Sequence, residues 1–245
     1  GVAHPHVLGL KPYMQRRQAM KAEARPAPST VRELAQRLCA TVRTGDIRLT
    51  QKGRMRQDPA SSWMNFSATQ TISTTECSFD WRARTGPFGM ISVRDALVDG
   101  EGALDVKALG FIPIAHINAS PALTRGELMR YLAELPLAPA AILANPSLSW
   151  RSDGADRLIV SAGIHDKAAE VSFTLDGEGR IATIFANRPR GLKNDFTSTP
   201  WHGRFTDYRQ RLGVWLPFAA EVGWTINGAE FIYWEGRMQS WAVSG

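Results

Sequence analysis

The sequence predicts an α+β, mainly β fold, in which a curled antiparallel sheet forms a half-barrel of about ten or eleven strands covered by an inserted helical lid. Three observations predict it. Apolar and polar residues alternate with a period of two over most of the 245-residue chain, as in strands with one wet face. Short glycine-containing turns separate several of these strands. In the middle of the chain, Thr124 to Leu143 switches to the helical period.

The composition fits one globular domain, expected over 29–245 after a basic N-terminal arm over 1–28. With 44% hydrophobic residues, a chain of this length can bury a full core. The net charge is +6, but the basic residues are spread along the chain, so nucleic acid is not an expected partner. The densest basic segment, Lys11 to Arg25, is interpreted as a solvated face, with peripheral membrane contact as the alternative.

Targeting and redox signals are few. No run of about 18 apolar residues occurs, so no segment of these residues is expected to cross a bilayer. The chain begins at Gly1 rather than at methionine, which leaves an upstream signal or anchor open. Cys39 and Cys77 are too few for a disulfide framework. Both are interpreted as core thiols, with a single bridge between them as the alternative.

The first expected element is a helix over Thr30 to Val42. Thr30 and Glu33 have the spacing of a capping box, and Gly45 suits the C-terminal cap. The apolar residues that recur on one face of this helix are Val31, Leu34, Ala35, Leu38 and Val42.

Strands are expected from Ile47 onward, and three turns organise them. Phe88 to Val98 is predicted to be one longer strand that ends at Asp99-Gly100-Glu101-Gly102. The same four residue types recur over 176–179, and Asn227-Gly228 marks a third turn. Because glycine adopts positive φ readily, each turn predicts a hairpin, and the three together predict an antiparallel meander.

The helical stretch between the two groups of strands is interpreted as a lid on the concave face of the sheet. Thr124 and Glu127 form a second predicted capping box. Apolar residues recur on one face, and charged residues are expected on a solvated face. The apolar set is Leu128, Tyr131, Leu132 and Leu135, and the charged set is Arg125, Glu127, Arg130 and Glu134. Pro136 ends this helix, and a second short helix follows over Ala140 to Leu143.

A sheet that curls around a helix leaves an apolar concave face, and most of the eight tryptophans are expected to fill the core there. The alternative is that some of them line a cavity for an acyl chain or other apolar ligand. Arg94 and Asp95 straddle a predicted strand, so one of them must point inward, where a charge requires a partner and would hold a ligand head group. The candidate ligand-binding residues are Trp81, Arg94, Leu128, Tyr131, Leu132, Leu135, Trp150, Trp201, Tyr208 and Trp224.

Catalytic motifs are absent from the sequence. It contains no G-x-S-x-G elbow, no P-loop and no G-x-G-x-x-G. The five histidines are scattered and lack metal-ligand spacing. No catalytic residue, metal site or cofactor is therefore expected.

Four segments in fixed order carry a family resemblance. They are RYLAELPLAP (Arg130 to Pro139), LSW (Leu148 to Trp150), PWHGRFTDYRQRLGVWLP (Pro200 to Pro217) and FIYWEGRM (Phe231 to Met238). Together they resemble a bacterial family of unknown function whose members look like relatives of the LolA/LolB lipoprotein-carrier fold. The resemblance covers Asp46 to Ala242 and implies a half-barrel of antiparallel strands over helices, with a hydrophobic groove inside.

The resemblance implies no activity, because shared fold does not assign function. Family members often carry aromatic residues where this chain has Leu137 and Ala138, which bears on the width of the groove. Members also often have membrane segments upstream, which implies a bacterial cell envelope or periplasmic location, with the cytoplasm as the alternative.

Three functions are carried forward. The leading hypothesis is noncatalytic binding of an apolar or amphipathic ligand, a lipid or lipidated partner, in a cavity beneath Leu128, Leu132 and Leu135. The second is an enzyme of unrecognised type that uses acids and arginines of the concave face, which an acid of strongly raised pKa in a compact polar pocket would favour. The third is an inert structural or interaction module. Ligand identity and oligomeric state are not predicted.

Overall fold

The computed structural model describes residues 29–41, 45–109, 112–192 and 195–244. The predicted basic arm, 1–28, lies outside the described residues, as does Val42 at the end of the first predicted helix. No helix within the described ranges combines the length and hydropathy that crossing a bilayer requires.

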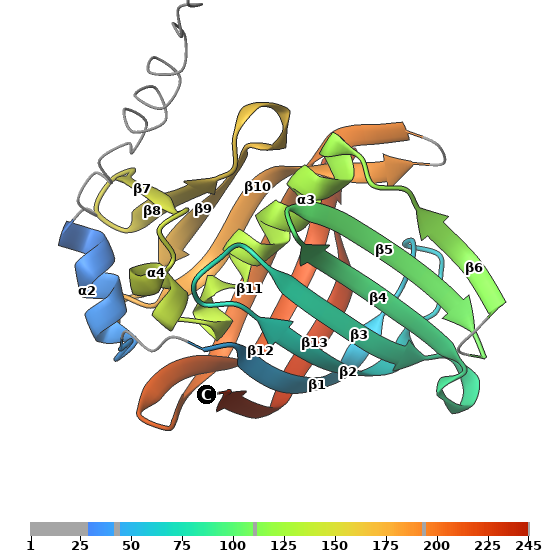
Figure 1. Cartoon of the computed structure of the whole chain (residues 1–245), viewed down its shortest axis with the longest axis horizontal. Coiled ribbons are helices and arrows are strands. Elements are labelled where there is room, and N and C mark those ends of the chain that lie inside the picture. The colour runs from blue at the N-terminus through green and yellow to red at the C-terminus, as the bar shows by residue number, and fades with distance from the viewer. Residues whose placement is uncertain (1–28, 42–44, 110–111, 193–194, 245) are drawn as a thin grey trace, which may run out of the picture.

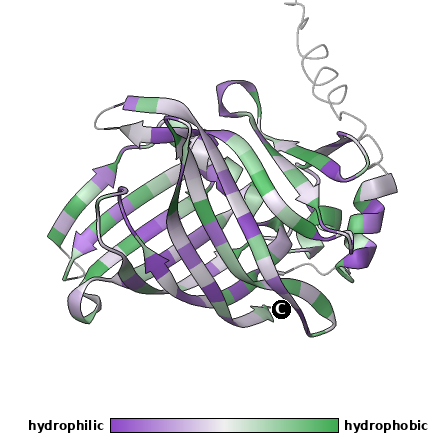
Figure 2. Cartoon of the chain, turned by 180° about the vertical axis from the view of Figure 1, so that it is seen from behind, coloured by the Kyte–Doolittle hydropathy of each residue, from purple (hydrophilic) through white to green (hydrophobic). Residues whose placement is uncertain are grey.

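One antiparallel sheet dominates the described part of the chain, with thirteen strands where about ten or eleven were expected (Figure 1). The strands are β1 (Ile47–Met55), β2 (Met64–Ile72), β3 (Phe79–Thr85), β4 (Ile91–Val98), β5 (Glu101–Ala108), β6 (Ile112–Ile117), β7 (Ser149–Ser152), β8 (Arg157–Ala162), β9 (Ala169–Leu175), β10 (Ile181–Leu192), β11 (Asp195–Arg211), β12 (Val214–Ile226) and β13 (Ala229–Val243). Figure 2 shows hydrophilic and hydrophobic residues alternating along many of them, and the predicted fold class is confirmed.

Two meanders make up this sheet. Strands β1 to β6 form one half and β7 to β13 the other, and the halves join where β1 pairs with β13. The two edge strands are therefore β6 and β7, which are consecutive in the chain. The segment between them has to return across the open side of the curled sheet. It contains α3 (Pro121–Ala133), η2 (Leu135–Leu137) and α4 (Ala140–Ala144), and Figure 1 shows α3 lying across the concave face.

The start of α3 differs from the prediction. The helix begins at Pro121, and the Ser120 hydroxyl caps it by accepting a hydrogen bond from the Leu123 N–H at 3.1 Å. Thr124 instead accepts from the Gly102 N–H at 3.0 Å, and Glu127 pairs with Arg188. The predicted Thr124 capping box is therefore wrong. Serine at the N-cap followed by proline at the first helical position is the signal that marks the observed start.

The first helix, α2 (Ser29–Arg37), also ends earlier than predicted. Cys39 adopts a φ of 52°, and the Ala40 N–H donates to the Ala35 carbonyl at 2.8 Å. This is a Schellman-type ending in which cysteine occupies the position that glycine usually takes, so Gly45 is not the cap. Cys39 is exposed rather than in the core, and both it and Cys77 are free thiols.

The three predicted hairpins are confirmed, but the two DGEG sequences make different turns. Asp99-Gly100 has φ values of 52° and 75°, and Asn227-Gly228 has 50° and 79°, as in two-residue type I′ turns. In the second DGEG the Asp176 carboxylate accepts from the N–H groups of Glu178 and Arg180, both at 2.9 Å. That turn is longer, because the last residue of β9, Leu175, pairs with Ile181 and residues 176–180 connect them.

The longer strand predicted over Phe88 to Val98 is shorter in the structure. It begins at Ile91, and the preceding residues form a tight turn, η1 (Pro87–Gly89). Phe88 has a φ of 54° in this turn, which excludes it from the strand. Its side chain is fully exposed.

Candidate functional site

A cavity of about 550 Å³ lies between α3 and the concave face of the sheet. Both halves of the sheet and one edge of the helical segment line it, mostly with apolar side chains. The first half contributes Trp81, Val93 and Val106, the second half Ile184, Trp201, Phe205 and Trp234, and the helical segment Arg130, Ala133, Glu134 and Leu137. Near the turns of the first half, Met55, Met64, Ile91 and Ile114 also line the cavity.

Of the ten predicted ligand-binding residues, Trp81 and Trp201 line this cavity. The apolar face of α3, made of Leu128, Tyr131 and Leu132, is in the packed core together with Leu135. Tyr131 donates its hydroxyl proton to the Ser73 carbonyl at 3.0 Å. The predicted cavity beneath the leucines is therefore misplaced: the space lies beside them, under the face of α3 that was expected to be solvated.

Three further predicted residues lie away from the cavity lining. Trp150 packs on Phe173 with ring centroids 6.0 Å apart, and Tyr208 donates to the Ile181 carbonyl at 2.8 Å. Trp224 stacks on Tyr233 with ring centroids 5.9 Å apart. These aromatic side chains pack in or against the core, which was the first interpretation of the tryptophans, rather than lining the cavity.

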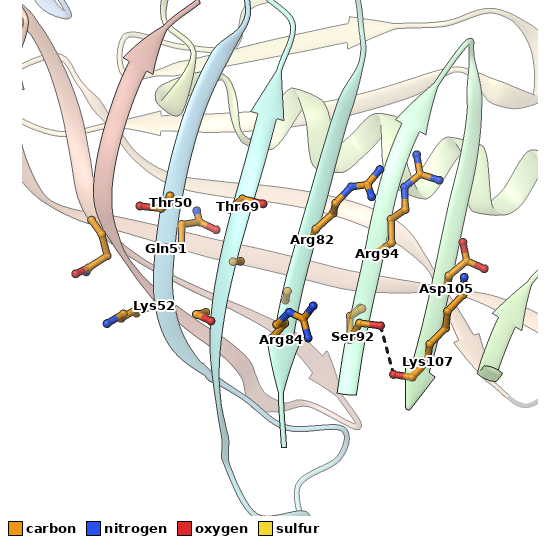
Figure 3. A pocket seen from close by; sticks show the side chains of 15 residues that line it. Thr50, Gln51, Lys52, Thr69, Arg82, Arg84, Ser92, Arg94, Asp105 and Lys107 are labelled. Atoms are coloured by element: carbon orange, nitrogen blue, oxygen red, sulfur yellow. Dashed lines mark hydrogen bonds between the residues drawn. The ribbon is translucent and has the colours of Figure 1, made fainter. Parts of the chain in front are cut away.

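Arg94 lies on the outer face of the sheet, so its expected interior position is corrected. It donates to the Asp80 carboxylate at 2.9 Å and lines a separate outer hollow (Figure 3). Burial opposes the ionisation of Asp80, but hydrogen bonds from Arg82 and Arg94 lower its pKa. The inward residue of the pair is Asp95, which lies in register with Trp81.

Asp95 belongs to a polar cluster on the cavity wall. Arg130 of α3 donates from Nη1 to Asp95 Oδ2 at 2.5 Å and from Nε to Glu134 Oε1 at 2.9 Å. Its guanidinium lies over the rings of Phe79 and Trp81, 4.9 and 5.1 Å from their centroids. The Arg130 and Asp95 side chains are 14% and 15% exposed. A charge this covered requires close partners, which explains the two carboxylates around one guanidinium.

A second ion pair joins α3 to β10. Arg188 donates from Nε to the Gly126 carbonyl at 2.9 Å and from Nη2 to Glu127 Oε1 at 3.1 Å. Its guanidinium lies 4.7 Å from the Trp201 ring centroid. No local sequence pattern marks this pair, because Glu127 and Arg188 are 61 positions apart and both are residue types that usually lie on the surface.

The two clusters meet at a pair of acids. Burial, together with the charge of Asp95 and a hydrogen bond to it, raises the pKa of Glu127 well above its ordinary value. Asp95 Oδ1 and Glu127 Oε2 are both buried and lack a hydrogen-bond donor among the described residues. A proton shared between these two oxygens would satisfy both, which agrees with the raised pKa of Glu127.

The curled sheet wrapped over a helix, with an apolar cavity between them, defines a protein of the half-barrel class. Residues 38–242 match a family of unknown function, DUF6920, and the chain belongs to that family. The family resemblance seen in the sequence is thereby confirmed. No curated protein sequence matches the chain.

Solved structures with the same architecture share little sequence with this chain. A putative outer membrane lipoprotein-sorting protein domain from Vibrio parahaemolyticus is 11% identical, with a TM-score of 0.50 over 90% of this chain and 93% of that chain. A DUF1329 family protein from Desulfovibrio piger is 10% identical, with a TM-score of 0.50 over 89% and 93%. A LolA superfamily protein from Nitrosomonas europaea is 8% identical, with a TM-score of 0.48 over 89% and 93%. These similarities concern the fold alone.

Proposed function

We propose that this protein is a noncatalytic carrier or receptor that binds an amphipathic ligand, a lipid or the acyl part of a lipidated partner, in the cavity between α3 and the sheet. The observation that carries the proposal is the cavity of about 550 Å³ with apolar walls. Ligand sites range over roughly 300–1,000 Å³ and combine apolar walls with a few placed polar groups. The Arg130 and Asp95 cluster supplies such groups.

The arrangement of the walls supports an amphiphile over a purely apolar ligand. The apolar walls extend to Met64 and Ile114 beside the turns of the first half, whereas Arg130 and Glu134 lie along α3. A ligand with one polar end would place its tail along the strands and its head against α3. The lipoprotein-sorting protein of similar fold gives associational support for this ligand class and for a cell-envelope location.

The acid pair is the observation that favours the second candidate, an enzyme. A carboxyl of raised pKa beside a carboxylate occurs in acid–base catalysis. Here, however, Glu127 is buried and is not among the residues that line the cavity. Among the described residues no hydroxyl or thiol is hydrogen bonded to either acid. The pair lacks a neighbouring nucleophile, so we place binding first.

Two adjacent residues of β4 test the proposal, because Val93 lines the cavity and Ser92 points to the outer face. Val93→Trp fills the cavity, and Ser92→Trp adds the same ring outside. We expect Val93→Trp to weaken binding of phenylnaphthylamine, an apolar fluorescent probe, by roughly ten-fold or more, and Ser92→Trp to bind it like the wild type. Circular dichroism confirms that both variants fold. Equal probe binding by folded Val93→Trp would contradict the proposal.

A further inference from the structure

Many exposed apolar side chains lie at one end of the strands of the first half, where the cavity reaches the turns. In an antiparallel meander alternate turns lie at the same end of the strands, so the β1–β2 and β3–β4 connections lie together with the end of β5 and the start of β6 at the right-hand end of Figure 1. We call the exposed apolar residues there the apolar rim: Met64, Phe88, Met90, Leu109, Ile112 and Ile114. Met64 and Ile114 also line the cavity, so the rim borders its mouth.

Phe88 is the most exposed member of the rim, with 100% of its side chain accessible. It sits between Gly86 and Gly89, which have φ values of 73° and 67°, and itself has a φ of 54°. Hydrogen bonds from Gly89 N–H to Gly86 O and from Met90 N–H to Pro87 O, both 3.1 Å, close this turn. The turn therefore exposes the Phe88 ring to solvent. The backbone of Phe88 also adopts a conformation that is uncommon for residues other than glycine. Folding gains nothing from that arrangement, which points to a partner.

A row of cations lies directly behind the rim on the outer face. Strand register places Lys52, Ser67, Arg84, Ser92 and Lys107 opposite one another across five neighbouring strands. Strands are about 4.8 Å apart, so Lys52, Arg84 and Lys107, which we call the cation row, are spaced by roughly 10 Å. Figure 3 shows all three beside the outer hollow of about 850 Å³.

The cation row differs from the row next to it. Arg82 and Arg94 both pair with Asp80, whereas no carboxylate in the described residues pairs with Lys52, Arg84 or Lys107. Arg84 precedes the turn that carries Phe88, and Lys107 precedes Leu109. Arg84 and Lys107 therefore lie within a few residues of exposed apolar side chains, and Lys52 continues the same row two strands from Arg84.

We propose that the apolar rim and the cation row together form a docking surface for an anionic phospholipid bilayer. Apolar side chains that enter the interface and cations that contact lipid phosphates are the two components of peripheral membrane binding. A single-stranded nucleic acid fits less well, because the hollow beside the cations has no aromatic residue on which bases could stack. Docking through the apolar rim turns the mouth of the cavity toward the membrane. That consequence rests on the proposed function.

Flotation with vesicles of phosphatidylglycerol and phosphatidylcholine tests the docking surface. We expect Phe88→Ser to weaken binding by about ten-fold, and the double change Arg84→Gln, Lys107→Gln by about thirty-fold, with loss of the preference for phosphatidylglycerol. The matched apolar control is Ile164→Ser. Ile164 is also highly exposed, at 73%. It lies in the second half, between β8 and β9, and so outside the apolar rim; its neighbour Gly163 packs against Leu128 of α3. The charge control is Arg32→Gln, Arg151→Gln. Both controls should bind like the wild type.

Several results would overturn the docking surface: wild-type protein that does not float with the anionic vesicles, Phe88→Ser that binds them normally, or Ile164→Ser that is weakened as much as Phe88→Ser. The two proposals fail separately. Val93→Trp should lose the apolar probe yet still bind vesicles, and Phe88→Ser should bind the probe normally in solution. Probe binding without vesicle binding leaves the cavity function standing and removes the docking surface; the reverse removes the cavity function alone.

Discussion

Among the residues that the structure describes, buried charge is concentrated where α3 meets β4 and β10. Arg130 pairs with two carboxylates and Arg188 with one, and the guanidinium of each lies over aromatic rings. Removing one partner of such a buried pair typically costs about 3–5 kcal/mol, because the other charge is left uncompensated. These residues therefore fix the helix against the sheet as well as shape the wall of the cavity.

Glu127 should make the stability of the protein depend on pH. Its pKa is raised in the folded state by burial and by Asp95, so its protonation contributes stability that is fully present below its ordinary pKa and is lost as the pH rises through the raised value. Glu127→Gln keeps a neutral donor to Asp95 and has no proton to lose. In urea unfolding over a pH series, we expect the wild-type free energy of unfolding to fall relative to Glu127→Gln as the pH rises.

The control for this prediction is Glu178→Gln in the exposed turn between β9 and β10, which should run parallel to the wild type. Glu127→Ala should be less stable than the wild type by about 3–5 kcal/mol, because it removes the acceptor of Arg188 and the donor to Asp95. Parallel pH curves for the wild type and Glu127→Gln would show that the proton is not held on this acid.

Residue alternation shows why part of the site could be predicted and part could not. The period of two placed Trp81 on the concave face correctly, and it implied that Arg94 and Asp95 point to opposite faces. It did not indicate which of the two points inward. That choice depends on Arg130, which reaches Asp95 from a helix 35 positions away. A local pattern carries no information about such a partner.

At the scale of elements, hairpins and apolar helix faces followed their sequence signals, whereas the charged face of α3 did not. The charged residues of α3 have the spacing of a solvated helix face, yet Glu127 is buried and Arg130 nearly so. The cause is topological, because the helix links the two edge strands and is covered on both sides. A prediction from amphipathic spacing assumes that one face of the helix is in solvent, and α3 has buried residues on nearly all sides.

The turn between β12 and β13 offers a test of local backbone preference. Gly228 has a φ of 79°, and nothing lies within 4 Å of an added Cβ there. Gly177 is equally open but lacks a positive φ. We expect Gly228→Ala to lower the free energy of unfolding by about 1–2 kcal/mol, and Gly177→Ala to leave it nearly unchanged, both measured by urea unfolding. Equal effects of the two substitutions would show that the left-handed backbone at Gly228 is not the cause.

At the scale of the whole molecule, two meanders are joined into one sheet by strands from opposite ends of the chain. The described part of the sheet has β1 and β13 at its centre, paired from Ile47 with Val243 to Met55 with Trp234, with a register shift between Thr50 and Gln51. Hairpin signals predicted each meander, because a hairpin pairs neighbours in sequence. They could not predict this central pairing, since its two strands are separated by nearly the whole chain.

This closure predicts that both halves unfold as one cooperative unit. The first half pairs with β13 through β1. The helix α3 contacts both halves, because it packs on Gly102 of β5 and pairs with Arg188 of β10. Unfolding of either half would therefore expose the core of the other. In native-state hydrogen exchange, we expect the slowest amides of β3 and of β10 to exchange with the same free energy of opening, equal to that from urea unfolding. Amides of the exposed edge strand β6 should exchange faster and serve as the internal control. A separate, lower free energy for either half would show that the β1–β13 ladder joins two independent folding units.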